Sequence, residues 1–203
     1  MIHVAQADGV WTVTIDRPEK ANSLTREMLS QIADAAEKAA AEGARVFVLR
    51  GTGKVFSAGA DLDEARAGLA TDGVWERLSG AIAALPCLTI AALNGTLAGG
   101  AMGMVLACDL RLAVPEAKFF YPVMKLGFLP QPSDPKRLAG LIGPARAKMI
   151  LMAGQKIGAE EARIWGLVDR VVPGEAMEAE IATLAADARG AAPAHVAAIK
   201  AMI

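Results

Sequence analysis

Alternating apolar and polar residues mark the first segment of the chain. In GVWTVTIDRP, residues 9–18, the side chains of Trp11, Val13 and Ile15 fall on one face at a period of two. Pro18 ends the run, and the preceding residues alternate in the same way. This pattern predicts a β-strand with one buried face.

Between Leu24 and Glu42 the period changes to that of a helix. The apolar positions that carry it are Leu29, Ile32, Ala36 and Ala40. Ser23 or Thr25 can cap the start, and Gly43 is suited to end the helix.

Short apolar runs and helical periods alternate through the rest of the chain. Buried strands are predicted at 45–51, 87–93 and 110–114, and a strand or extended segment at 166–172. Helices are predicted at 61–68, 73–85, 100–109, 134–142, 144–153, 158–165 and 174–189, with a loop at 52–62. This order indicates an α/β fold with mainly parallel strands.

Length and composition narrow the class of protein. With 203 residues, 54% of them hydrophobic, we expect one globular domain, and no apolar run reaches the ~20 residues of a membrane span. The N-terminus lacks the pattern of a signal peptide, so we expect a cytoplasmic protein. Because 21 basic and 22 acidic residues nearly cancel without a basic run, nucleic acid is not an expected partner.

Few residues are suited to metal or histidine chemistry. Cys87 and Cys108 lie in apolar surroundings without a CxxC pattern, which favours buried, reduced thiols. His3 and His195 stand near opposite ends of the chain, so a histidine-based catalytic group is not expected.

Two predicted strand-to-helix junctions consist of small residues: SAGAD, residues 57–61, and NGTLAGGAMG, residues 94–103. Ligands of α/β folds gather at such junctions, where helix-start amides point outward. Three interpretations of the second loop compete. The first is close packing of a helix on a strand, which would be preferred if this loop stood alone. The GxGxxG pattern of dinucleotide sites does not fit, because Ala98 stands where a glycine is needed. The third interpretation is an oxyanion hole with one backbone N–H from each loop.

Five motifs in order extend the picture: IDRPEKANSL, VFSAGADL, NGTLAGGAMGMVLACDLRLA, KLGFLP and KMILMAGQKIGAEEARIWGLVDRVVP. From about Val10 to Pro173 the chain resembles the crotonase (enoyl-CoA hydratase/isomerase) superfamily. The resemblance implies a crotonase-like spiral of ββα units over residues 1–173, followed by C-terminal helices over 174–203. It further implies assembly as trimers or pairs of trimers, and acyl-CoA thioesters as substrates without another cofactor. In the family, further helices follow a position such as Lys200 and cover the site.

The resemblance also assigns roles to residues. The amides of Ala60 and Gly100 would form the oxyanion hole. The adenine and pantetheine would be bordered by Ala58, Asp61 and Leu62, and Lys20 would lie near the CoA phosphates. From the residues themselves, the Asp61 side chain is better explained as the cap of the helix that DLDEAR opens.

The chain lacks two acidic residues that hydratases of the family have. Hydratases place glutamates where this chain has Gly103 and Val123. Among nearby candidates, Tyr121 can line the acyl pocket and donate a hydrogen bond, although an aromatic residue in KFFYP is more often simply packed in the core. Asp134 lies in QPSDPKRL, which resembles a loop from which some members of the family supply a catalytic acid, although the position that they use matches Gln131 better. Because Pro135 follows it, Asp134 also has the pattern of a helix N-cap, which is the favoured interpretation.

These departures leave two functions open. The first is an enzyme that adds water, shifts a double bond or hydrolyses a thioester. The second is a protein of the same fold that binds acyl-CoA without turnover. A serine hydrolase is excluded, because residues 94–104 hold no serine.

Overall fold

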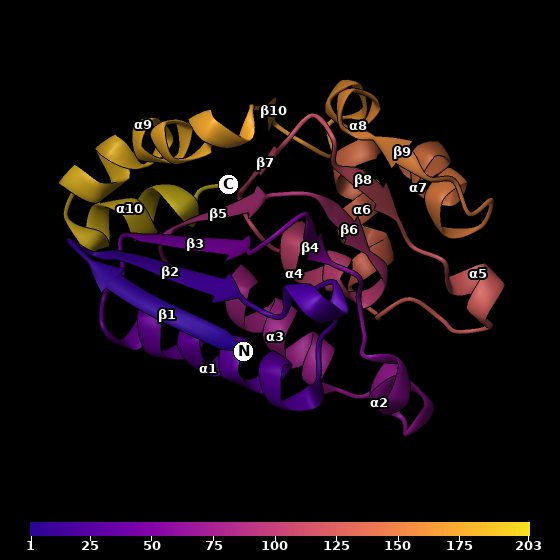
Figure 1. Cartoon of the computed structure of the whole chain (residues 1–203). Helices are drawn as coiled ribbons and strands as arrows, with labels where there is room; N and C mark the ends of the chain where they lie inside the picture. The colour runs from indigo at the N-terminus through magenta and orange to yellow at the C-terminus, as the bar shows by residue number, and fades with distance from the viewer.

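The computed structural model describes all 203 residues, which form two sheets surrounded by helices (Figure 1). The larger sheet has six strands in the order β1-β2-β3-β5-β7-β10. Its strands are β1 Ile2–Ala7, β2 Val10–Ile15, β3 Val46–Gly51, β5 Leu88–Leu93, β7 Leu110–Ala113 and β10 Arg170–Val171. All neighbours pair in parallel except β1 and β2, which form an antiparallel hairpin.

The smaller sheet has four short strands in the order β4-β6-β8-β9. They are β4 Val55–Ser57, β6 Thr96–Ala98, β8 Lys118–Phe120 and β9 Ile157–Gly158. The first three are parallel, and β9 pairs with β8 in the antiparallel sense. The loop predicted at 52–62 therefore contains a strand, and the other three short strands were not predicted either.

Ten α-helices and four short 3-10 helices complete the fold. The α-helices are α1 Arg26–Ala41, α2 Leu62–Arg66, α3 Val74–Ala83, α4 Met102–Leu106, α5 Val123–Leu126, α6 Asp134–Ile142, α7 Pro144–Leu151, α8 Ala159–Trp165, α9 Met177–Gly190 and α10 Pro193–Lys200. The 3-10 helices are η1 Pro18–Lys20, η2 Leu69–Thr71, η3 Gly99–Ala101 and η4 Gly174–Ala176. Every helix is too short or too polar to cross a membrane.

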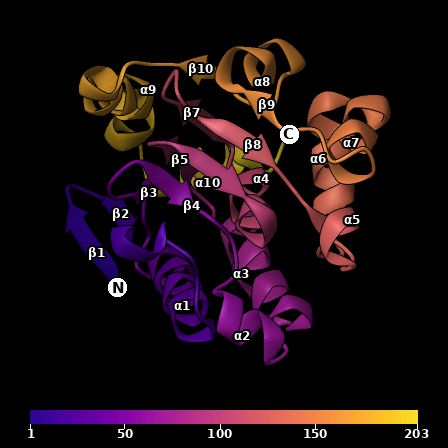
Figure 2. The same ribbon diagram turned by 45° about the vertical axis from the view of Figure 1, so that its right-hand side comes forward.

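The order of elements repeats. A strand of the larger sheet is followed by one of the smaller sheet and then by helices: β3 and β4 precede α2 and α3, β5 and β6 precede α4, and β7 and β8 precede α5 and α6. This repetition confirms the predicted α/β fold of ββα units. Helices α1 and α3 lie side by side below the larger sheet, and α9 crosses its other face (Figures 1 and 2).

Predicted burial agrees with the structure in the first units. Trp11, Val13 and Ile15 are buried in the larger sheet. The Thr25 hydroxyl accepts from the Met28 amide at 3.2 Å and caps α1. Cys87 and Cys108 are buried free thiols, as expected.

Candidate functional site

The two loops of small residues open into one cavity of about 330 Å³. Its walls are mainly apolar and come from α2, α3, η3 and the segment after β8. The lining includes Ala58, Ala60, Leu62, Arg66, Trp75, Gly99, Gly100, Tyr121, Val123, Leu126, Phe128, Leu129 and Gln131. A larger hollow, of about 850 Å³, lies between α10 and the ends of β5 and β7, but neither loop reaches it.

The first loop turns its Ala60 amide away from the protein. Leu24 and Ala60 form an isolated parallel bridge, in which the Leu24 N–H donates to Gly59 and the Leu24 carbonyl accepts from Asp61, both at 2.8 Å. In such a bridge the groups of the middle residue point to the opposite side. The Ala60 N–H has no acceptor within the protein, and Ala60 lines the cavity.

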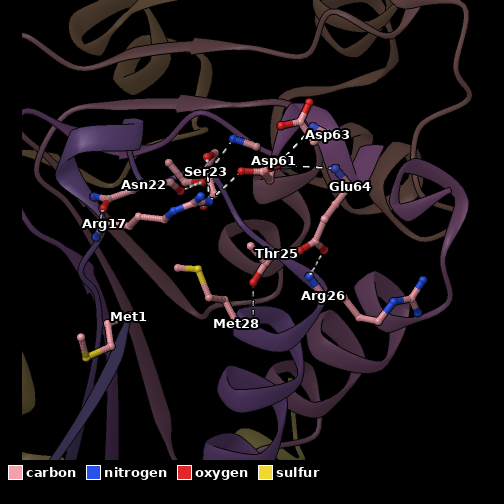
Figure 3. A network of polar contacts seen from close by, with 12 residues as sticks. Met1, Arg17, Asn22, Ser23, Thr25, Arg26, Met28, Asp61, Asp63 and Glu64 are labelled. Atoms are coloured by element: carbon pink, nitrogen blue, oxygen red, sulfur yellow. Dashed lines mark hydrogen bonds and ion pairs between the residues drawn. The ribbon is translucent and has the colours of Figure 1, made fainter. Parts of the chain in front are cut away.

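A polar network holds this loop (Figure 3). The Arg17 guanidinium donates to Asp61 Oδ2 at 2.8 Å and to the Ser23 carbonyl at 3.1 Å. Asp61 Oδ1 accepts from the Asp63 amide at 3.1 Å, so Asp61 caps α2. The hydrogen bond from Arg17 holds the pKa of Asp61 below its usual value. The network ties the loop to η1 and to the start of α2.

The second loop presents Gly100 at the start of η3. The first amides of a helix lack partners within it, and Gly100 is the second residue of η3. Gly59 and Gly99 both have positive φ, +94° and +59°, and a Cβ on Gly59 would lie 3.0 Å from the Ala98 carbonyl oxygen. Glycine is therefore needed for the two loops to meet this closely.

Trp75 of α3 forms the wall beside Gly100. A Cβ on Gly100 would lie 3.3 Å from its ring, and the indole N–H donates to the Leu69 carbonyl at 2.8 Å. The tryptophan is thereby fixed against Gly100, and little room remains there for a larger side chain.

An acid lies behind the cavity. Asp134, the first residue of α6, is 1% exposed, and Tyr121 Oη donates to its Oδ2 at 2.9 Å. Asp134 Oδ1 has no hydrogen-bond partner, and a Cβ on Gly103 would lie 2.6 Å from it. Because Gly103 has no side chain, α4 leaves the space that the carboxyl group fills.

The prediction that Asp134 is a helix cap is wrong. Ser133 occupies the cap position, and the Asp134 side chain accepts no amide of α6. The Asp-Pro pair is typical of a helix start, and that much is correct. The direction of the side chain depends on Tyr121 and Gly103, which are distant in sequence. No local sequence feature indicates this direction, because the burial of Tyr121 and the approach of Gly103 to the acid are visible only in the structure.

Burial raises the pKa of the Asp134 carboxyl to about 6. The hydrogen bond from Tyr121 opposes this change, the charge of Glu76 adds to it, and the charge of Arg137 opposes it. Burial and the charge of Asp134 also raise the pKa of Tyr121 above its usual range, so the phenol keeps its proton.

The structure brings together most of the residues that were singled out from the sequence. Ala58, Ala60, Leu62, Gly100 and Tyr121 line the cavity. Asp61 adjoins it as the cap of α2, which is the expected role of its side chain. Lys20, at the end of η1, is exposed and does not line the cavity, whereas Arg66 does. Val123 stands in the wall.

Comparison with known proteins agrees with this architecture. A family model for enoyl-CoA hydratase/isomerase matches residues 5–203. The chain belongs to this family. A probable enoyl-CoA hydratase of Mycobacterium tuberculosis is 36% identical over 189 residues, which are 91% of this chain and 77% of that protein.

Other members differ in the reactions that they are named for. A 4-chlorobenzoyl coenzyme A dehalogenase of Arthrobacter is 32% identical over 205 residues, 96% of this chain and 74% of that protein. Among solved structures, an enoyl-CoA hydratase/carnithine racemase from Magnetospirillum magneticum superposes with a TM-score of 0.91 at 32% identity, over 99% of this chain and 79% of that one. Family membership thus gives the fold and the class of enzyme, and within that class the reactions differ.

Proposed function

We propose that the cavity binds an acyl-CoA thioester whose carbonyl oxygen accepts hydrogen bonds from the amides of Ala60 and Gly100. Membership of the enoyl-CoA hydratase/isomerase family makes the chain an acyl-CoA-processing enzyme. The observation that supports the site best is the outward Ala60 N–H, which has no acceptor in the protein and borders the same cavity as Gly100. Two fixed donors would stabilise the negative charge that develops on a thioester oxygen when an enolate forms.

The rest of the lining suits the two ends of such a substrate. Leu126, Phe128 and Leu129 offer an apolar surface for the acyl chain. Arg66 is the one charged residue of the lining, and we assign to it the role near the CoA phosphates that the family resemblance implied for Lys20. Ala58 and Leu62 would border the adenine and pantetheine. Assembly as a trimer or hexamer, like a cytoplasmic location, stays a prediction.

The test is a panel of acyl- and enoyl-CoA thioesters at high enzyme concentration, followed by mass spectrometry. A gain of water, an unchanged mass with a shifted double bond, and free CoA distinguish the three reactions. If ligands raise the thermal stability and no product forms, the chain is an acyl-CoA-binding protein. The absence of acids at Gly103 and Val123 keeps that alternative open.

Two variants of one residue test the amide of Gly100. Gly100→Pro removes the N–H, whereas Gly100→Ala keeps it and adds a Cβ at 3.3 Å from Trp75. Loss of one such donor lowers kcat by about 10²- to 10³-fold in measured cases. We expect that loss in Gly100→Pro and much less in Gly100→Ala, with both variants folded by circular dichroism. Equal activities would remove Gly100 from the oxyanion hole.

A further inference from the structure

The Asp134 carboxyl is buried without hydrogen bonds to both of its oxygens. One oxygen accepts from Tyr121 at 2.9 Å, and the other has no partner. A buried polar atom without a hydrogen bond costs free energy, and a buried charge costs more. Since an apolar residue would fill this space at lower cost, stability does not explain an acid here.

Tyr121 connects this acid to the cavity. Tyr121 lines the cavity together with Gly100 and Gln131, and its hydroxyl donates to Asp134 Oδ2 and accepts from the Gln131 amide at 3.4 Å. Tyr121 and Arg66 are the only lining residues with an ionisable side chain, and Arg66 is paired with Asp63 at 3.1 Å on the surface. Tyr121 is therefore the group through which a proton can pass between the cavity and a buried acceptor.

We propose that Tyr121 and Asp134 form a proton relay that removes and returns a proton on the carbon beside the thioester carbonyl. This inference rests on the proposed acyl-CoA site. The C–H bond breaks, and its electron pair forms the enolate, whose oxygen accepts from the amides of Ala60 and Gly100. The proton adds to Tyr121 Oη while the phenol's own proton passes to Asp134 Oδ2. The reverse transfer restores the C–H bond.

Tyr121 is the catalytic residue of this relay, and Asp134 is a positioning residue that acts through it. The charged groups that face Asp134 are Glu76 of α3 and Arg137 of α6. The Ser133 hydroxyl joins the two, because it donates to Glu76 at 2.8 Å and accepts from Arg137 at 3.0 Å. A proton acceptor works best when its pKa lies near the working pH, and burial gives Asp134 a pKa of about 6.

The test is deuterium exchange into butyryl-CoA, incubated with the protein in D2O and followed by mass spectrometry. Exchange at the carbon beside the carbonyl needs the enolate but neither hydration nor isomerisation. General acid–base groups contribute about 10²- to 10⁴-fold, and we expect Asp134→Asn and Tyr121→Phe each to lower the exchange rate by that factor. The double variant should lose no more than the slower single variant, because the two residues act as a unit.

The pH profile separates a relay from a structural role. The wild-type exchange rate should rise as Asp134 ionises around pH 6, and Asp134→Asn should lack this rise. Asp187→Asn is the matched control, since Asp187 is exposed on α9 and should leave the rate unchanged. Gly103→Ala serves as a second variant, because its Cβ would displace the Asp134 carboxyl and lower the rate with both relay residues present.

Binding is measured alongside as the thermal shift with butyryl-CoA. A wild type that neither binds nor exchanges butyryl-CoA would overturn the proposed function and the relay with it. Binding without exchange in the wild type, or unchanged exchange in folded Asp134→Asn and Tyr121→Phe, would overturn the relay alone. If either variant fails to fold, a wild-type rate that is constant from pH 5 to pH 8 overturns it.

Discussion

Burying Asp134 has a cost in stability that depends on pH. Its ordinary pKa is 3.8, and burial raises it to about 6 in the folded state. The native state then binds a proton more tightly than the unfolded state, so stability falls as the pH rises from about 4 to about 6. Above that range the whole cost is present. A shift of about two units, at about 1.4 kcal/mol each, amounts to about 3 kcal/mol.

Replacing Asp134 with asparagine should remove this cost. The amide oxygen can still accept from Tyr121, and no charge has to be buried. We expect Asp134→Asn to be more stable than the wild type by about 3 kcal/mol at pH 8 and by less than about 1 kcal/mol at pH 4. The measurement is urea unfolding of both proteins at several pH values, analysed as the difference in free energy of unfolding.

The change of this difference with pH is the decisive quantity. A difference that stays constant from pH 4 to pH 8 would mean that the two side chains merely pack differently, and the reasoning would be refuted. A less stable variant at pH 8 would refute it as well. Asp187→Asn, on the surface of α9, should follow the wild type over the whole range.

Three further substitutions test the framework around the site. Gly95→Ala places a Cβ 2.0 Å from the Lys54 carbonyl oxygen, which is backbone, and should cost about 3 kcal/mol in urea unfolding. Asn22→Ala removes a buried side chain that makes three backbone hydrogen bonds and should cost a similar amount, about 3 kcal/mol, in the same assay. Asp61→Asn weakens the pair with Arg17 and should cost about 1 kcal/mol at pH 7, falling toward zero below about pH 4, because the Asp61 pKa is lowered in the folded state. A Gly95→Ala or Asn22→Ala variant as stable as the wild type, or a cost at Asp61 that grows as the pH falls, would contradict these expectations.

Most of the larger sheet could be predicted from the sequence, whereas the smaller sheet could not. Strand β10 of the larger sheet, with two residues, was predicted only as a strand or extended segment. Strands such as β2 and β3 are six residues long, which is enough to show alternation or a continuous apolar run. Strands β4, β6 and β8 have three residues each, and β9 has two. Periodicity cannot be read from so few positions. These strands are set by their neighbours in space, and they position the two glycine loops.

Part of the candidate site could be predicted from the sequence, and part could not. The two loops could be found because small residues at strand-to-helix junctions have a local cause, the close approach of two backbones, whereas the choice of Ala60 and Gly100 within them came from the family resemblance. The role of Asp134 could not, because local sequence at Asp134 and Pro135 favours a cap. What decides the direction of its side chain is a hydroxyl on Tyr121 and an absent side chain at Gly103.

The proposed Gly100 donor and the buried acid Asp134 come from separate elements of the fold. Gly100 and Gly103 belong to adjoining turns, η3 and α4, whereas the acid comes from α6. Because the Asp134 carboxyl meets Gly103 on one side and Tyr121 on the other, it reaches the cavity only through a phenol that keeps its proton. In the proposed relay, such a group would carry a proton to or from a carbon beside the thioester carbonyl. Because it would not present a carboxylate to water, this arrangement would favour proton transfer along the acyl chain over the addition of water.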